Sequence, residues 1–355
     1  MQARNWVEIS RAALRHNCDY VRRLLPPGTE LCAVVKADAY GHGAVECARV
    51  FEACGAAWLA VTSVEEGARL RQAGIGARIL VLAGFAAEET AALIQHQLTP
   101  AVWDAAQIAW LDAAQPPEGF PIHLKFDTGM GRLGVTEEQA PQVAATLAAA
   151  PRLRVEAVFS HLAMGEAEDG IFSRQQHRRL TAAAEGRPWH LLNGEATLRF
   201  ADWGGMLARV GLPLYGYSTQ MEHAGQLRPA LAWKARVISV KELPAGHGVG
   251  YGARYRAPAR MRAATLAVGY ADGYHRDLWP EAVVLLGGQP APVAGAISMD
   301  LATVDAGQAP RPAVGDEAVL IGGALSAERL ARWADTLPYE ILCGISARVP
   351  RVYVE

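Results

Sequence analysis

The residues with the clearest chemical potential lie in the segment LCAVVKADAYGHG, residues 31–43. Lys36 follows an apolar, strand-like run, and a glycine-flanked turn carrying Tyr40 and His42 comes directly after it. Lysine is rarely fully buried without a partner, and desolvation lowers its pKa and frees the amine as a nucleophile for carbonyl groups. Lys36 is therefore a candidate nucleophile, although a lysine that leaves a strand end for solvent would show the same local pattern.

Other polar residues stand at the ends of later apolar runs. They are Lys125 and Asp127, Ser160 and His161, Asn193, and Arg209. Each also has a structural interpretation: Lys125 and Asp127 would pair with each other, His161 would be a core histidine, and Arg209 would donate to a structural ion pair. Only a fold that brings these ends together would favour a shared site.

The order of the apolar runs predicts such a fold. Helix-like stretches separate most of them, and residues 62–74 are the clearest, with Thr62 or Ser63 as N-cap and Gly74 as terminator. This alternation predicts a (β/α)8 TIM-like barrel, in which functional groups gather at the carboxyl ends of the strands. An open doubly wound sheet is the competing topology, but no G-x-G-x-x-G follows the first strand. The predicted strands are Leu31–Val35, Trp58–Val61, Ile79–Leu82, Pro100–Trp103, Ile122–Phe126, Val155–Phe159, Trp189–Leu192 and Ala208–Tyr215.

Beyond residue 222 the pattern changes to short strand-like segments between Gly and Pro clusters. This predicts a mainly β second domain, so that the chain divides into residues 1–222 and 223–355. The segments are Trp233–Val240, Thr265–Val268, Ala282–Leu286, Pro292–Ile297 and Ala318–Ile321, with one helical pattern at Ser326–Ala334.

The glycines near Arg209 favour close approach of the backbone to a ligand. Backbone N–H groups near Gly211 and Leu212 are candidates to hold a phosphate at the barrel mouth. A lysine, a phosphate cradle and an arginine together suggest a phosphorylated carbonyl cofactor held as a Schiff base. In the second domain Tyr251 lies between two glycines, and its phenol is a candidate acid–base group.

Composition excludes several classes of protein. The 355 residues carry a net charge of -2 with no long basic run, so neither nucleic acid nor an anionic membrane is an expected partner. The five cysteines fit no zinc pattern, and no metal site is predicted. Without an N-terminal apolar segment, the chain is expected to be cytoplasmic with reduced cysteines.

Five separated motifs together resemble the alanine racemases, a two-domain family that depends on pyridoxal 5'-phosphate (PLP). The motifs are A-V-V-K-A-D-A-Y-G-H-G, K-F-D-T-G-M-G-R-L-G, R-V-G-L-P-L-Y-G, G-Y-G-A-R-Y with V-G-Y-A-D-G, and S-M-D. The resemblance covers nearly the whole chain and implies racemisation of a small amino acid, most simply L-alanine to D-alanine. It also implies a role in supplying or consuming D-alanine, a peptidoglycan precursor.

The resemblance implies a role for each matching residue. Lys36 and Tyr251 would be the two catalytic bases on opposite faces of the substrate Cα, with Tyr251 donated by the partner subunit of a head-to-tail homodimer. Lys125 resembles a lysine that is often carbamylated and would orient Arg132. Arg132 and Met299 would hold the substrate carboxylate. The cofactor would be bound by Lys36, Tyr40, His161, Asn193, Arg209, Gly211 and Leu212.

Three positions depart from the family pattern. Gly194 stands where a phosphate-binding serine is usual, Ala347 replaces a tyrosine beside the site, and Ala296 replaces an arginine. The space at Ala347 favours a second hypothesis, a racemase acting on serine or on several small amino acids. A hypothesis of another class is a non-catalytic PLP-binding barrel protein, which would lack the β domain and Tyr251. A decarboxylase of related architecture is disfavoured by the G-Y-G-A and D-T-G-M-G-R segments.

Overall fold

The computed structural model describes residues 3–355 and divides into two units. One unit comprises Ala13–Ala39 and Gly43–Arg228. The other joins the N-terminal segment up to Ala12 with Tyr40–His42 and Pro229–Glu355. The sequence predicted one boundary near residue 222, whereas the structure assigns the first strand and three residues of the Lys36 segment to the second unit.

The first unit is the predicted (β/α)8 barrel. Eight strands pair in the order β8-β7-β6-β5-β4-β3-β2-β9, and every neighbouring pair along this path is parallel. Hydrogen bonds from Met206 N to Trp189 O (2.6 Å) and from Arg209 N to Leu192 O (3.0 Å) link the two ends, β8 and β9. The strands are β2 (Glu30–Val34), β3 (Trp58–Val61), β4 (Arg78–Val81), β5 (Thr99–Val102), β6 (Phe120–Lys125), β7 (Leu153–Phe159), β8 (Trp189–His190) and β9 (Leu207–Val210).

Each predicted barrel strand overlaps an observed one. The last prediction extends to Tyr215, but β9 ends at Val210 because the chain turns at Gly211 into the short 3-10 helix η3 (Leu212–Tyr215). The predicted helix after β3 is α4 (Val64–Gln72), and the Ser63 hydroxyl caps it by accepting from Glu66 N.

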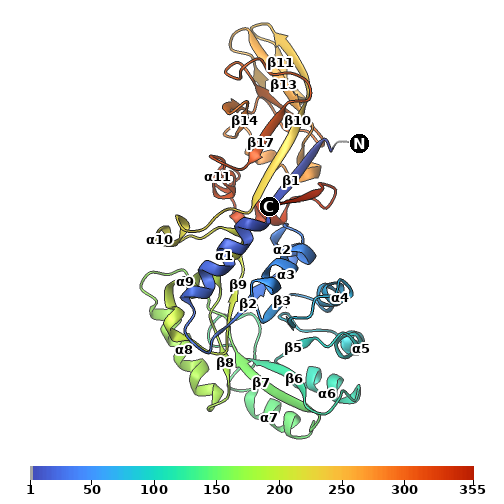
Figure 1. The fold of residues 1–355 in the computed structure, drawn as a ribbon, viewed down its shortest axis with the longest axis vertical. Coiled ribbons are helices and arrows are strands. Elements are labelled where there is room, and N and C mark those ends of the chain that lie inside the picture. Colours follow the sequence, from blue (N-terminus) through green and yellow to red (C-terminus); the bar gives the residue numbers. More distant parts are fainter. Residues whose placement is uncertain (1–2) are drawn as a thin grey trace. The chain divides into compact units, whose positions relative to one another are not determined.

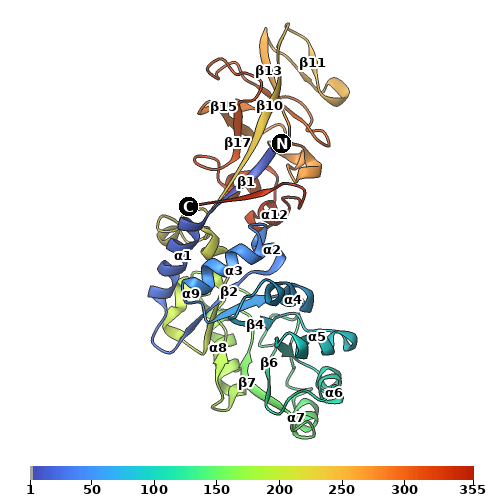
Figure 2. The ribbon, with the colours of Figure 1, turned by 45° about the vertical axis from the view of Figure 1, so that its right-hand side comes forward.

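Helices α3 to α8 lie around the outside of the barrel strands (Figures 1 and 2). Their apolar faces pack on strands whose side chains are almost all buried, as expected for a parallel sheet covered by helices. The helices of this unit are α1 (Arg11–Leu24), α2 (Lys36–Tyr40), α3 (Ala44–Ala53), α4, α5 (Thr90–Gln95), α6 (Ala105–Ala113), α7 (Ala140–Ala148), α8 (Ile171–Ala184), α9 (Gly194–Phe200) and α10 (Met221–Ala224), with 3-10 turns η1 (Ala87–Glu89) and η2 (Ala201–Trp203). No described helix is long and apolar enough to cross a membrane.

The second unit is mainly β, as predicted. Its central strand β10 (Leu231–Leu243) pairs antiparallel with β1 (Asn5–Ser10), which lies beside it in Figure 1. The strand β1 in turn pairs parallel with β18 (Arg351–Val354), so the two ends of the chain share one sheet. The other elements are β11 (Gly248–Val249), β12 (Tyr255–Arg256), β13 (Met261–Leu266), β14 (Val283–Leu286), β15 (Gln289–Pro292), β16 (Ala302–Asp305), β17 (Glu317–Ile321), α11 (Ala327–Trp333), α12 (Pro338–Cys343), η4 (Tyr251–Ala253), η5 (Tyr270–Asp272) and η6 (Arg276–Leu278).

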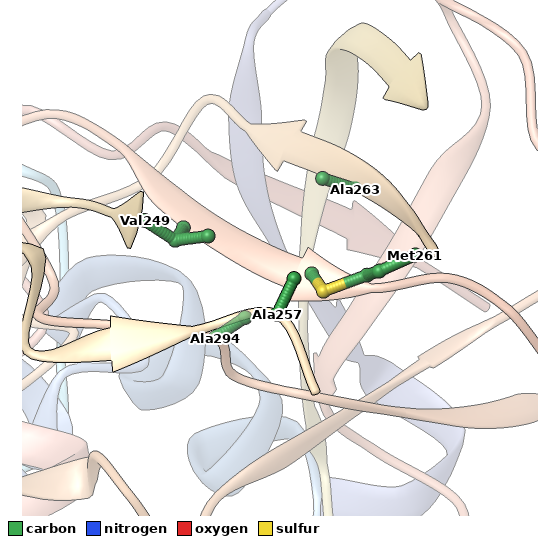
Figure 3. Packing of buried hydrophobic residues seen from close by; sticks show 5 residues of the cluster. All are labelled: Val249, Ala257, Met261, Ala263 and Ala294. Atoms are coloured by element: carbon green, nitrogen blue, oxygen red, sulfur yellow. The ribbon is translucent and has the colours of Figure 1, made fainter. Parts of the chain in front are cut away.

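The segment predicted as a strand over 292–297 is irregular after Pro292. Here β15 ends, and Gly295 has φ 86°, where a Cβ would lie 2.6 Å from Val249 O. A small apolar cluster surrounds this contact: Figure 3 shows Val249, Ala257, Met261, Ala263 and Ala294, all buried. This cluster anchors the β11–β12 hairpin, whose tip carries Tyr251.

Candidate active site

Lys36 begins an unusual left-handed turn at the carboxyl end of β2. The four residues after it, Ala37 to Tyr40, all have φ between 51° and 55°. For residues other than glycine this conformation costs about 1–2 kcal/mol each, and such backbone strain concentrates at functional sites. Contacts with neighbouring residues must therefore stabilise this turn, because the intrinsic conformational preference of its residues does not.

Hydrogen bonds from three directions hold the turn. Ala39 N donates to Val35 O at 2.9 Å, and an Asp38 carboxylate oxygen accepts from Ala44 N at 2.8 Å, the first residue of α3. Glu66 on α4 accepts from Ala37 N at 2.7 Å, and its other oxygen accepts from Thr62 N at 2.7 Å. One carboxylate thus caps its own helix and fixes the peptide that follows Lys36.

We expect Glu66→Ala to lower both stability and activity. The variant loses two short hydrogen bonds to a carboxylate, each worth about 1.5–3 kcal/mol in a protein. Thermal unfolding and steady-state kinetics of Glu66→Ala, compared with Glu65→Ala in the same helical turn, measure the effect. Glu65 is exposed, so its variant should behave as the wild type. Equal behaviour of the two variants would show that the Ala37 contact does not position Lys36.

Lys125 ends β6 and is buried, with its Nζ 5.4 Å from the Phe159 ring centroid and 5.9 Å from that of Trp103. Burial first, and then the charges of Arg209, Arg132 and Lys36, lower its pKa to about 8. Asp127 opposes this shift, and its carboxylate is bound by backbone N–H groups of the loop that follows. A cationic pocket that favours a neutral lysine also favours an anion in its place.

Asp127 has a different partner from the one its sequence spacing suggested. One of its oxygens accepts from the backbone N–H groups of Gly129 (2.9 Å), Met130 (2.9 Å) and Gly131 (3.1 Å). Val135 N donates to Lys125 O at 2.8 Å and closes the loop. This loop therefore has a fixed shape, and it carries the exposed Arg132 from the end of the same strand as Lys125.

Arg209 is buried in β9, and its two Nη groups are bound inside the barrel. Nη1 donates to His190 Nδ1, and Nη2 donates to Ser160 O at 2.7 Å and Leu191 O at 3.2 Å. Among residues 3–355, no acceptor bonds Nε, which leaves that donor for a ligand. Burial lowers the pKa of Arg209 to about 10, so it stays charged at neutral pH.

His161, at the end of β7, lies near this arginine. Burial, followed by Arg209, Arg132, Lys125 and Lys36, lowers its pKa well below the ordinary value, so the ring is neutral. Lys36, Lys125, Arg132 and Arg209 all lower the pKa of His161, so these five residues lie within electrostatic reach of one another. Their strand ends converge as a barrel requires, and the roles proposed for these residues stay predictions.

A row of polar side chains extends from Arg209 through the barrel interior. His190 Nε2 lies 2.9 Å from His123 Nδ1, and His123 Nε2 lies 3.4 Å from a Glu156 carboxylate oxygen. Arg78 and Arg154 bind the other Glu156 oxygen at 3.1 Å each. An arginine can only donate, so His190 Nδ1 accepts; each neutral ring then carries its proton on Nε2 and donates toward Glu156.

Gln176 of α8 connects the loops at the mouth and is fully buried. Its Nε2 donates to His161 O at 3.0 Å and Thr128 Oγ1 at 3.3 Å, and its Oε1 accepts from Ala163 N at 2.9 Å. Thr128 Oγ1 also lies 2.8 Å from Ser160 Oγ. These bonds fix the ends of β6 and β7 relative to each other.

The remaining predicted cofactor residues divide between the units. Asn193 caps α9 by accepting from Ala196 N at 3.0 Å, and Gly211 and Leu212 follow β9 in the same unit. Tyr40 belongs to the β unit, where its ring centroid lies 5.8 Å from that of Tyr339. Burial, then Tyr339 and Cys343, raise the pKa of Tyr40, which keeps its phenol protonated.

The β unit gathers its own motifs into a second cluster. Tyr270 N donates to Ser298 O at 3.0 Å, which joins the V-G-Y-A-D-G turn to the S-M-D turn. Arg348 binds Asp272 at 2.7 Å and Asp300 at 2.8 Å, which joins both turns to the segment that contains Ala347. Three large side chains on these turns and on the β11–β12 hairpin are exposed: Tyr251, Tyr270 and Met299.

Comparison with known proteins identifies the family of the chain. The family model of the alanine racemase N-terminal domain matches residues 9–219, and that of the C-terminal domain matches residues 230–353. The chain belongs to the alanine racemase family. These enzymes are isomerases that act on amino acids, and the matches support alanine racemase function for this chain.

Individual alanine racemases align over almost the full length. The enzyme of Desulfovibrio desulfuricans is 39% identical, over 99% of this chain and 98% of its own. That of a Nostoc species is 38% identical, over 99% and 96%. The crystal structure of alanine racemase from Streptomyces lavendulae superposes with a TM-score of 0.94 at 36% identity, covering 100% of this chain and 98% of that one.

Sequence reasoning missed four buried or nearly buried residues that support the candidate site residues through hydrogen bonds: His123, Glu156, Gln176 and His190. Alternation along β6 was an available signal, because side chains two apart in a strand share a face and His123 precedes Lys125 by two. The pairing of His123 with His190 on β8 depends on the register of nonadjacent strands, which no local pattern encodes.

Proposed function

We propose that this chain interconverts L- and D-alanine with PLP as cofactor, Lys36 and Tyr251 acting as the two bases. The observation that carries the proposal is the position of Lys36, in a braced left-handed turn at a cationic barrel mouth. The mouth suits a cofactor with a phosphate and a substrate with a carboxylate, since both are anions.

The residues present fit PLP. The Arg209 Nε donor, unused within the barrel, matches an acceptor such as a pyridine nitrogen, while its Nη groups stay fixed by His190 and Ser160. Lys36 would hold the cofactor covalently, and His161 would support Arg209. Tyr40, Asn193 and the backbone N–H groups of Gly211 and Leu212 would bind the phosphate. When bound, PLP supplies an electron sink for the carbanion at the substrate Cα.

The residues of the chain then manage the proton. Racemisation removes the Cα proton on one face and returns a proton on the other, so it needs two groups on opposite sides. Lys36 would serve one face, and Tyr251 from the partner subunit of a head-to-tail homodimer would serve the other. The exposed fraction of Tyr251, 74%, suits a side chain that completes a site on another subunit. Arg132 and Met299 would hold the substrate carboxylate.

We expect Lys125 to be carbamylated. Its neutral amine would attack CO2, forming an N–C bond and releasing a proton, and the anionic product would lie among Arg132, Arg209 and Lys36. Because the pKa is lowered to about 8, more of the reactive amine is present at pH 7–8 than for an ordinary lysine, and the carbamate should increase as pH rises through 8. In 13C-bicarbonate, NMR should show a carbamate resonance that Lys125→Ala lacks. Persistence of the resonance in that variant would assign it elsewhere.

A shift in substrate is the second candidate function. Ala347 is exposed on the segment that Arg348 ties to both turns of the β unit, and it offers neither the bulk nor the hydroxyl of the usual tyrosine. A wider pocket would admit serine, although pocket size alone discriminates by roughly 10–200-fold per methylene.

An assay of a panel of L-amino acids for D-product decides between the two. We expect alanine to be the best substrate of the wild type and Ala347→Tyr to reduce turnover of serine more than that of alanine. If only alanine reacts and Ala347→Tyr has no effect, the wider pocket has no role. If no amino acid yields D-product although PLP binds to Lys36, the chain is a non-catalytic PLP-binding protein.

The proposed setting is the cytoplasm, where the chain would supply D-alanine for peptidoglycan precursors or consume it. No disulfide joins the cysteines among the described residues, consistent with a reducing compartment.

A further inference from the structure

The position that lacks the usual serine has no room for one. A Cβ on Gly194 would lie 2.9 Å from Pro213 Cδ, 3.4 Å from Pro213 Cγ and 3.5 Å from Gly211 N. The first distance is shorter than real Cβ contacts allow, and the proline ring cannot swing aside as a flexible chain would. The Pro213 ring therefore occupies the space that a side chain at residue 194 would need, and packing excludes a serine hydroxyl at this position.

The next residue makes an extensive set of contacts with a segment beyond η3. Glu195 is only 9% exposed. Its carboxylate accepts from Ser218 Oγ at 2.9 Å, Thr219 Oγ1 at 3.1 Å, Thr219 N at 3.3 Å and Gln220 Nε2 at 3.1 Å. Gln220 Nε2 also donates to Glu195 O at 2.6 Å, and Gln220 N donates to Ser218 Oγ at 3.0 Å.

These contacts satisfy a nearly buried carboxylate without a cationic partner in the described structure. Charge-assisted bonds of this kind are stronger than neutral ones, and here they bind Ser218, Thr219 and Gln220 to one carboxylate. Within the described residues, Gln220 Oε1 is buried without a hydrogen-bond partner. Residues 218–220 are thus fixed to the start of α9.

The network encloses the backbone that follows Arg209. Between Gly211 and Ser218 the backbone makes short turns, with Leu214 N bonded to Gly211 O at 2.9 Å and Tyr217 N to Leu212 O at 3.4 Å. Two long-range bonds also hold the middle of this segment: Asn17 Nδ2 donates to Leu214 O at 3.2 Å, and the Tyr215 hydroxyl donates to Val34 O at 2.9 Å. One end of this segment is held by β9 and the other by Glu195. The backbone N–H groups of Gly211 and Leu212 are therefore positioned from both sides.

We propose that Glu195 is a positioning residue that fixes residues 211–220, so that the backbone grips a cofactor phosphate in place of the missing serine hydroxyl. The inference rests on the proposed function, since it requires PLP at this barrel mouth. Glu195 itself, an anion, does not contact the phosphate. Its effect passes through Ser218, Thr219 and Gln220 to the backbone N–H groups.

Binding of PLP compared with pyridoxal, the same molecule without phosphate, tests this role. Fluorescence titrations of the purified full chain should show PLP binding weakened about 10- to 100-fold in Glu195→Ala, as for loss of one or two charge-assisted bonds, with pyridoxal binding unchanged. Glu195→Gln should retain part of the PLP affinity. Glu222→Ala, an exposed glutamate just beyond the network, is the matched control and should bind both as the wild type does.

Other results separate the possible failures. Equal weakening of PLP and pyridoxal, or no weakening of PLP, would overturn the positioning role. If Glu195→Ala does not fold, the double variant S218A/T219A, which keeps the carboxylate, must show the same phosphate-specific loss. A wild type that forms no Lys36-dependent cofactor absorbance band would instead refute the proposed function.

Discussion

Replacing Lys36 by alanine is expected to abolish the absorbance band of lysine-bound PLP and to reduce racemisation at least about a thousandfold, because covalent attachment and one of the two bases are lost together. Tyr251→Phe should keep the band, since Tyr251 is proposed to move a proton without binding the cofactor covalently. Absorbance spectra and D-alanine formation, measured on the same preparations, check both results. A Lys36→Ala variant that retained the band would place the cofactor on another lysine.

The same two variants test whether the site is shared between subunits. In a head-to-tail homodimer, a heterodimer of Lys36→Ala and Tyr251→Phe chains contains one site with both defects and one with neither. Co-expression should therefore restore about a quarter of wild-type activity, since half the dimers are mixed and each has one intact site. Without restoration, Tyr251 would act within its own subunit or not at all.

The barrel was predictable because each of its strands is a short buried run with a helical pattern beside it. Ser63 shows the same agreement at one residue, since its capping role follows from Glu66 three positions on. The assignment of Asn5–Ser10 was not predictable, because its partners lie more than two hundred residues away. A strand-like pattern predicts that a segment forms a β-strand, but it does not predict which sheet the strand joins.

In the candidate site, too, some features could be predicted from the sequence and others could not. Lys36 and Arg209 could be recognised in the sequence because each is a charged residue in or next to an apolar run. The family motifs then imply their roles. The left-handed backbone after Lys36 was not foreseeable, because Ala37 and Ala39 normally avoid that conformation and adopt it here only with the support of neighbours such as Glu66. Gly194 likewise reads from sequence as a lost hydroxyl, whereas the structure adds that Pro213 fills the space.

The buried row from Arg209 to Glu156 should show a graded response to mutation. His190→Leu keeps the side-chain volume but leaves a buried guanidinium N–H without its acceptor, so the barrel should lose about 3 kcal/mol of unfolding free energy. His123→Leu removes a neutral acceptor and should cost about 1–2 kcal/mol. Glu156→Gln should cost about as much, because an amide whose oxygen accepts from His123 turns its NH2 group toward the Arg78 and Arg154 donors. Urea unfolding measures the series, with the exposed His247→Leu as control.

The pH dependence of stability distinguishes the row from ordinary core packing. Burial lowers the pKa of His190 and of His123 below the ordinary 6.5, so the unfolded chain binds protons that the folded chain does not. Stability is therefore fully present above pH 6.5 and declines as pH falls below it. The decline should be shallower in His123→Leu than in the wild type.

His190→Leu should also lower kcat more than it changes KM for alanine, because Arg209 is proposed to contact the cofactor and not the substrate. An unchanged pH slope, or a reversed order of stability losses, would show that the two histidines do not couple Arg209 to Glu156.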